Sequence, residues 1–232
     1  VLLHNVEYSH LIRLLRYQDE LDCTALHRCA ENNNNEAIKI ILDCVSEEEC
    51  SQLLSITHWW RCTPLHESCA GGDTESVNVM LNHINQDMRY SLLQMTSNDS
   101  NTPLHLALYQ GHTDVMKVIH ESVTQTQWIN LLQMKRPCQR TVLQEAAFED
   151  KQSFIDAIRD SVSDEEWLHL LSTPLPEWDD DDNLYHQRTA NTINELRAAA
   201  RVKYVLQTED DSGTFSCHDP LWGLSKLLYD RL

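Results

Sequence analysis

The sequence is poor in the residues that build turns and in basic side chains. Only 5 of its 232 residues are glycine and 6 are proline, which disfavours turn-rich all-β folds and suits helices joined by short connections. Lysine and arginine together number 18 against 36 acidic residues, so the formal net charge is −18. Such a chain repels phosphate groups, which argues against a general nucleic-acid binder and against attachment to anionic membranes.

Long apolar runs and paired cysteines are also missing. No stretch of about 18 apolar residues exists, so we expect no insertion of this chain into a membrane. No charged segment followed by an apolar stretch indicates a secretory signal. Eight cysteines are scattered without a Cys-x-x-Cys pair, a density too low for a disulfide scaffold. We therefore expect reduced thiols and an intracellular, cytoplasmic location.

What the sequence does contain is a repeat of 39 residues. A four-residue motif recurs as Thr24-Ala25-Leu26-His27, Thr63-Pro64-Leu65-His66, Thr102-Pro103-Leu104-His105 and Thr141-Val142-Leu143-Gln144. A pair of leucines follows each motif at residues 53–54, 92–93, 131–132 and 170–171. Agreement of several columns across four copies predicts a solenoid of stacked units.

The register of this repeat divides the chain into six segments. They are the C-terminal part of a preceding repeat (1–23), four repeats (24–62, 63–101, 102–140 and 141–179) and an irregular end (180–232). We expect further repeats upstream of Val1. We interpret 180–232 as a degenerate fifth repeat or capping region with insertions, since terminal repeats are usually atypical. The alternative is the start of a different domain.

Each unit is predicted to consist of three helices. Thr63 and Thr102 suit the N-cap of a first helix, and the prolines that follow them suit its first position. A polar or glycine break precedes a second, amphipathic helix, such as Asp114 to Glu121. Capping-box patterns at 46–49, 124–127 and 163–166 then predict a third short helix that carries the leucine pair.

The motif resembles that of the ankyrin-repeat family, whose signature is Thr-Pro-Leu-His-x-Ala. The resemblance covers residues 24–179 directly and implies an all-α solenoid with short β-hairpin fingers and a concave partner-binding face. The unit here is longer than the usual unit of about 33 residues. The predicted third helix accounts for the added length.

No residue pattern predicts catalysis or a bound cofactor. A glycine-rich phosphate loop, Gly-x-Ser-x-Gly and His-Glu-x-x-His are all absent from the sequence. His27, His66 and His105 fall on one repeat column, where the resemblance implies structural hydrogen bonds. His58, Cys62, His66 and Cys69 do not have the usual zinc-ligand spacing. The acidic run 179–182 lacks the spacing and glycine of an EF-hand and is interpreted as a solvated loop.

Candidate partner-binding residues lie where the repeats differ from one another. The finger tips vary most, and tryptophan and arginine are enriched in binding hot spots. An alternative is that one of the two tryptophans folds back onto the stack. The finger candidates are Trp59, Trp60, Arg61, Asn98, Asp99 and Gln139. On the inner helices, we expect Tyr109 and Phe148 to form an apolar anchor beside Glu145 and Glu149.

The sequence thus predicts a non-catalytic protein–protein interaction module that uses the concave face and the fingers. The alternative is a scaffold, or a cytosolic assembly or gating region of a larger protein such as an ion channel. Residues 141–179 carry ten acidic and two basic side chains, a net charge of −8. We therefore expect a basic partner, if there is one, near residues 145–182.

Overall fold

The computed structural model describes residues 7–176 and 184–212, with the side chains of the last helix described to residue 203. The chain divides into two compact units. The first contains the described residues to Ser161 together with 175 and 176, and the second contains Val162–Pro174 and 184–212. The acidic run 179–182 and the segment 213–232 lie outside the described residues, as do the expectations attached to them.

The first unit is a stack of helix triplets that follows the 39-residue period. It begins with α1 (Tyr8–Leu15). The inner helices are α2 (Ala25–Glu31), α5 (Pro64–Gly71), α8 (Pro103–Gln110) and α11 (Val142–Phe148). The outer helices are α3 (Asn35–Asp43), α6 (Thr74–Asn82), α9 (Thr113–Glu121) and α12 (Gln152–Asp160). The third helices are α4 (Glu47–Leu54), α7 (Gln86–Gln94) and α10 (Gln125–Gln133). The predicted third helix is therefore present.

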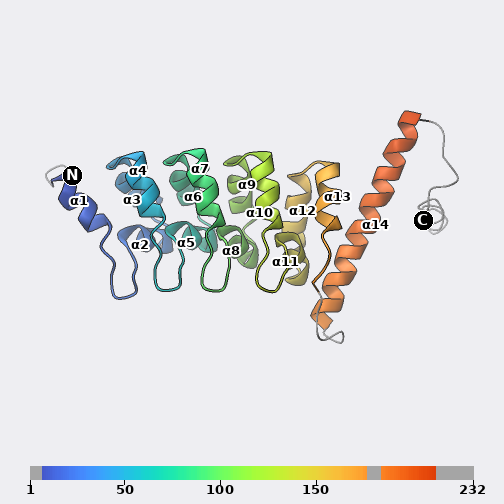
Figure 1. Ribbon diagram of the computed structural model, residues 1–232, viewed down its shortest axis with the longest axis horizontal. Coiled ribbons are helices and arrows are strands. Elements are labelled where there is room, and N and C mark those ends of the chain that lie inside the picture. The colour runs from blue at the N-terminus through green and yellow to red at the C-terminus, as the bar shows by residue number, and fades with distance from the viewer. Residues whose placement is uncertain (1–6, 177–183, 213–232) are drawn as a thin grey trace. The chain divides into compact units, whose positions relative to one another are not determined.

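Equivalent helices of neighbouring triplets pack on one another along the stack. Inner helices contact inner helices and outer helices contact outer helices of the neighbouring triplets. In Figure 1, α2, α5, α8 and α11 form one row, and the loops that precede them project from one side of it. This order places equivalent residues of successive repeats beside one another, so the loops form a continuous series.

The ends of the helices are set by capping residues that can be recognised in the sequence. Thr63 and Thr102 are N-caps whose hydroxyls accept from the backbone N–H three residues on, and proline occupies the first helical turn. The C-cap of helix α5 is Gly72, which has φ +74°. A Cβ atom built there would lie 2.7 Å from the ring of His112, so glycine is required both for its backbone conformation and for space.

The core follows the columns of the repeat. The motif leucines, exemplified by Leu26 and Leu65, are at most 1% exposed. The leucine pairs, exemplified by Leu53 and Leu54, are at most 4% exposed. Each buried leucine stabilises the fold by roughly 1.5–3 kcal/mol. Because every triplet contributes the same side chains, the core is continuous from triplet to triplet.

The second unit contains α13 (Asp164–Ser172) and α14 (Leu184–Ser212), which contact each other. Arg197 on α14 donates to the carbonyls of Leu171 and Thr173 at 2.7 and 3.0 Å. One helix spans Leu184–Ser212. The interpretation of 180–232 as a capping region remains a prediction.

The β-hairpin fingers implied by the resemblance are not seen as strands. No strand occurs among the described residues, 7–176 and 184–212. A tight turn of five residues takes the place of each hairpin. The all-helical architecture agrees with the expectation, and the difference is confined to these turns.

Candidate functional site

Each inner helix is preceded by a five-residue turn, which we call a finger. The four fingers are residues 19–23, 58–62, 97–101 and 136–140. The first residue of each donates its N–H to the carbonyl of the fifth at 2.9–3.3 Å. The fourth residue has φ between 58° and 62° and donates back to the carbonyl of the first at 2.8–2.9 Å. The finger is thus a closed turn, too short for a two-stranded ladder.

The left-handed position of each finger is held by a residue other than glycine. Asp22, Arg61, Ser100 and Gln139 occupy it. This backbone conformation costs roughly 1–2 kcal/mol per residue for side chains with a Cβ atom. Such strain persists where the surroundings impose it and is common at ligand-binding sites. The side chains of Arg61 and Gln139 are therefore held at exposed positions by a fixed backbone.

Neighbouring fingers are joined by backbone hydrogen bonds. Trp59 N–H donates to Leu21 O at 3.3 Å, and Asn98 N–H donates to the carbonyl of Trp60 at 2.9 Å. At the fourth finger the equivalent residue is Pro137, which has no N–H to donate. There the guanidinium of Arg136 donates to the carbonyl of Asp99 at 3.4 Å instead. The fingers therefore form one hydrogen-bonded edge.

Aromatic and apolar side chains gather at the tips of the first two fingers. Trp59 is 56% exposed and Trp60 is 40% exposed, and their ring centroids lie 4.7 Å apart in an edge-to-face arrangement. Leu21 of the first finger is 49% exposed. Neither tryptophan is buried against the stack. Asn98 and Asp99, at the tip of the third finger, are also exposed.

A polar cluster links the fourth finger to the inner helices. The carboxylate of Glu145, 1% exposed, accepts from Arg140 Nε at 2.5 Å and Arg136 Nη1 at 2.9 Å. It also accepts from the hydroxyl of Tyr109 at 2.6 Å. The guanidinium of Arg140 lies 3.9 Å from the centroid of the Phe148 ring. Helix α8, the fourth finger and helix α11 are thereby held together.

The charges and burial of this cluster determine which of its residues a partner can contact. Burial raises the pKa of Glu145, but the hydrogen bonds from Arg140 and Tyr109 outweigh it and the pKa is lowered overall. Glu145 is therefore an ionised group neutralised inside the fold. Tyr109 and Phe148 are half-buried, and Glu149 is exposed. Of the four inner-helix candidates, these three retain surface that a partner can reach.

The histidine column has the hydrogen bonds implied by the family resemblance. His27 Nδ1 lies 2.8 Å from Thr24 Oγ1, and the opposite nitrogen, Nε2, donates to the carbonyl of Cys62 at 3.1 Å. His66 bonds in the same way to Thr63 and to the carbonyl of Asn101.

The other two repeats vary this arrangement. His105 Nδ1 lies 2.8 Å from Thr102 Oγ1, whereas its buried Nε2 has no partner. In the fourth repeat Gln144 Oε1 accepts from Thr141 N at 3.1 Å, so the amide replaces the ring.

A different group of side chains has the composition of a metal site. Ligand atoms of His58, Cys62 and Glu67 all lie within 4.8 Å of one another. However, His58 Nδ1 accepts from Trp60 N–H at 3.0 Å, so the proton resides on Nε2, which donates to Glu67 at 2.8 Å. A metal would need the lone pair of Nε2 and would break this pattern. We interpret the group as a hydrogen-bonded support for the second finger.

A contact between finger and inner helix that we did not expect from the sequence recurs in three of the four repeats. The first finger residue pairs with a residue nine positions later: Asp19 with Arg28 at 2.6 Å, His58 with Glu67 at 2.8 Å, and Arg136 with Glu145 at 2.9 Å. The acidic partner lies in the first finger, whereas at the second and fourth fingers it lies on the inner helix. Complementary residues nine apart, repeated at the 39-residue period, were the signal that could have revealed it.

A comparison with protein families adds independent information. Residues 26–128 match a model of ankyrin repeats in three copies. No curated protein matches the sequence significantly. Among the described residues, no helix is both long and apolar enough to cross a bilayer. The match covers repeats whose triplets and N-terminal caps are described above, and residues 26–128 are therefore ankyrin repeats.

Proposed function

We propose that the chain is a non-catalytic module that binds a protein partner through its fingers and the adjacent inner-helix surface. Ankyrin repeats are generally protein–protein interaction modules. The observation that carries the proposal is the combination of a fixed finger backbone with exposed Trp59 and Trp60 at its tip. A rigid aromatic pair offers contact area at little cost in conformational entropy, as binding hot spots do.

The proposed contact surface extends from the second finger toward the fourth. Arg61, Asn98, Asp99 and Gln139 supply exposed polar groups at successive finger tips. Tyr109, Phe148 and Glu149 supply a mixed apolar and acidic surface on the inner helices. Glu145 acts by positioning Arg136 and Tyr109, because its own carboxylate is buried and paired.

A basic partner segment near residues 145–182 remains part of the proposal. Its support is the net charge of −8 over 141–179, of which Glu149 is an exposed member. A cytoplasmic location is proposed with it, because the seven described cysteines are free thiols and several are buried hydrophobic side chains.

Affinity capture followed by mass spectrometry tests this function. We expect Trp60→Ala to lose the proteins retained by the unmodified chain without lowering the melting temperature appreciably. Retention of the same proteins by Trp60→Ala, in amounts equal to the unmodified chain, would contradict the assignment of the second finger.

The alternative is that the repeats serve assembly within a larger protein, such as the cytosolic part of an ion channel. It is supported by two exposed apolar side chains, Leu14 on α1 at 61% exposure and Tyr17 just after this helix at 72% exposure. Light scattering distinguishes the two functions. Concentration-dependent self-association that Tyr17→Ser abolishes would favour assembly, whereas a monomer at all concentrations favours partner binding.

A further inference from the structure

A groove of about 610 Å³ lies between the third helices α4 and α7. These helices lie at the side of the stack away from the fingers (Figure 1). Helix α4 and its C-cap supply Glu47, Glu48, Ser51 and Ser55, and α7 with its N-cap supplies Asn85 and Met88. The groove belongs to the helix that lengthens this repeat beyond the ordinary ankyrin unit, and it is separate from the surface proposed above.

Helix α1 is followed by α4 in the same way that α4 is followed by α7, and an arginine fills the equivalent position between α1 and α4. Arg16 follows α1 and reaches across to α4, where its guanidinium donates to Glu49 at 2.7 Å and also to Gln52. The positions 39 residues after Arg16 and Glu49 are occupied by Ser55 and Met88. The arginine that bridges the first pair of third helices is therefore missing from the second pair. Because serine is much shorter than arginine, the space stays open.

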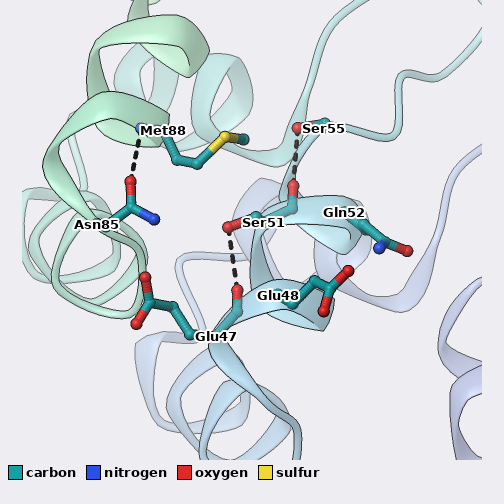
Figure 2. Close-up of a pocket in the computed structure, with 7 residues that line it drawn as sticks. All are labelled: Glu47, Glu48, Ser51, Gln52, Ser55, Asn85 and Met88. Atoms are coloured by element: carbon teal, nitrogen blue, oxygen red, sulfur yellow. Dashed lines mark hydrogen bonds between the residues drawn. The ribbon is translucent and has the colours of Figure 1, made fainter.

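The groove presents hydrogen-bond acceptors above an apolar floor. Ser51 donates its hydroxyl to the carbonyl of Glu47 at 3.0 Å, and Ser55 donates to the carbonyl of Ser51 at 2.7 Å (Figure 2). Their hydroxyl hydrogens are therefore used within α4, and the oxygen lone pairs remain to accept. In Figure 2 the Glu47 carboxylate lies beside Asn85, and the Met88 side chain extends toward α4.

The charge at this groove is uncompensated. No described lysine, arginine or histidine forms an ion pair with Glu47 or Glu48. Arg16, which reaches across to α4, is already bound to Glu49. A donor-rich cation on a long aliphatic stem matches acceptors around a methionine, because the stem covers the thioether while the head meets the carboxylate.

We propose that the α4–α7 groove is a docking site for an arginine side chain of a basic protein segment. The aliphatic stem of the guest arginine lies on Met88, and its guanidinium donates to Glu47 and to the hydroxyl oxygens of Ser51 and Ser55. The guest occupies the place that Arg16 occupies one repeat earlier. Arginine is preferred over lysine because its planar fork can donate to several acceptors at once.

The probe for this site is a short peptide made of arginine, compared with a lysine peptide of equal length and charge at physiological ionic strength. The methyl resonance of Met88 reports occupancy in an NMR titration. We expect the arginine peptide to shift this resonance and to bind more tightly than the lysine peptide. An unchanged Met88 resonance, or equal affinity for both peptides, would overturn the proposal.

Three variants locate the binding. Glu47→Gln should raise the Kd of the arginine peptide about fivefold, as expected for one partly exposed ion pair. Glu75→Gln is the matched control, because Glu75 is also exposed in the first turn of a helix, and it should change the Kd by less than about twofold. Ser55→Arg should abolish the Met88 shift, since the tethered guanidinium fills the groove.

Two further outcomes would reject the proposed arginine site. Equal weakening by Glu47→Gln and Glu75→Gln would mean general attraction to an acidic protein and would reject the site. Normal peptide binding by a folded Ser55→Arg variant would do the same. Trp60→Ala, which tests the finger surface, should leave the Met88 shift intact, so failure of one surface does not imply failure of the other.

Discussion

His27, His66 and His105 are the residues whose bonding responds most directly to pH. Burial lowers the pKa of each to about 4, because the imidazolium form would lose its solvation. In the unfolded chain the same side chains titrate near the ordinary value of about 6.5. Protons therefore bind the unfolded state more readily. Stability is complete above pH 6.5 and falls as the pH drops toward 4.

We predict that His66→Gln reduces this pH dependence. Gln144 shows that an amide can accept from the threonine N–H at the same column. Between pH 6.5 and 5 each buried histidine should lower the free energy of unfolding by about 1.5 kcal/mol. Urea unfolding at both pH values should show that acidification lowers the free energy of unfolding of the variant by about this much less than that of the parent chain. An identical pH dependence for variant and parent would contradict the burial of a neutral His66.

The buried carboxylate of Glu145 gives a second prediction at this scale. Glu145→Gln removes the counter-charge of Arg140, whose side chain is 10% exposed, and should lower the free energy of unfolding by about 3 kcal/mol or more. Glu149→Gln is the control, since Glu149 is exposed and should change stability by less than about 0.5 kcal/mol. Equal effects of both variants in urea unfolding would show that the cluster contributes nothing to stability.

At the scale of single elements, the C-cap of α5 allows steric crowding to be separated from backbone strain. Gly72 and Gly111 both have positive φ, 74° and 80°. A Cβ atom at Gly72 would collide with the His112 ring at 2.7 Å, whereas at Gly111 the nearest atom is Lys151 Nζ at 4.0 Å.

We expect Gly111→Ala to lower the free energy of unfolding by roughly 1 kcal/mol from backbone strain alone. Gly72→Ala should cost more, because it adds the collision with His112. Thermal unfolding of the two variants measures the difference. Equal melting temperatures for Gly72→Ala and Gly111→Ala would indicate that the His112 ring moves aside freely.

Much of the element structure could be predicted from the sequence, because it depends on local chemistry that repeats. The Thr-Pro caps, the leucine pairs and the third helix at Gln125–Gln133 all follow from short-range patterns. The fingers could not be predicted correctly. Whether a turn extends into two strands depends on which backbone groups form hydrogen bonds between neighbouring repeats. Pro137 has no N–H, so one of these hydrogen bonds is missing at the fourth finger. The burial of Glu145 was missed because Arg136 and Arg140 approach it only in the folded chain.

At the scale of the whole molecule, the uneven charge predicts how salt affects binding. The repeat at 102–140 has a net charge of +2, whereas 141–179 has −8. If a basic partner segment binds near the acidic repeat, raising the ionic strength should weaken the complex chiefly by slowing association. Binding kinetics measured across a salt series test this, and an association rate independent of salt would contradict an electrostatic contribution there.

The exposed tryptophans of the second finger are the residues that we expect to bind a protein partner. The most direct measurement is a calorimetric titration of the captured partner with the unmodified chain, Trp59→Ala/Trp60→Ala and the control Ile40→Ala. Ile40 is 50% exposed on the outer helix α3, away from the fingers. We predict that the double variant loses binding, whereas Ile40→Ala binds normally and all three chains melt at similar temperatures. Undiminished binding by the double variant would contradict the account.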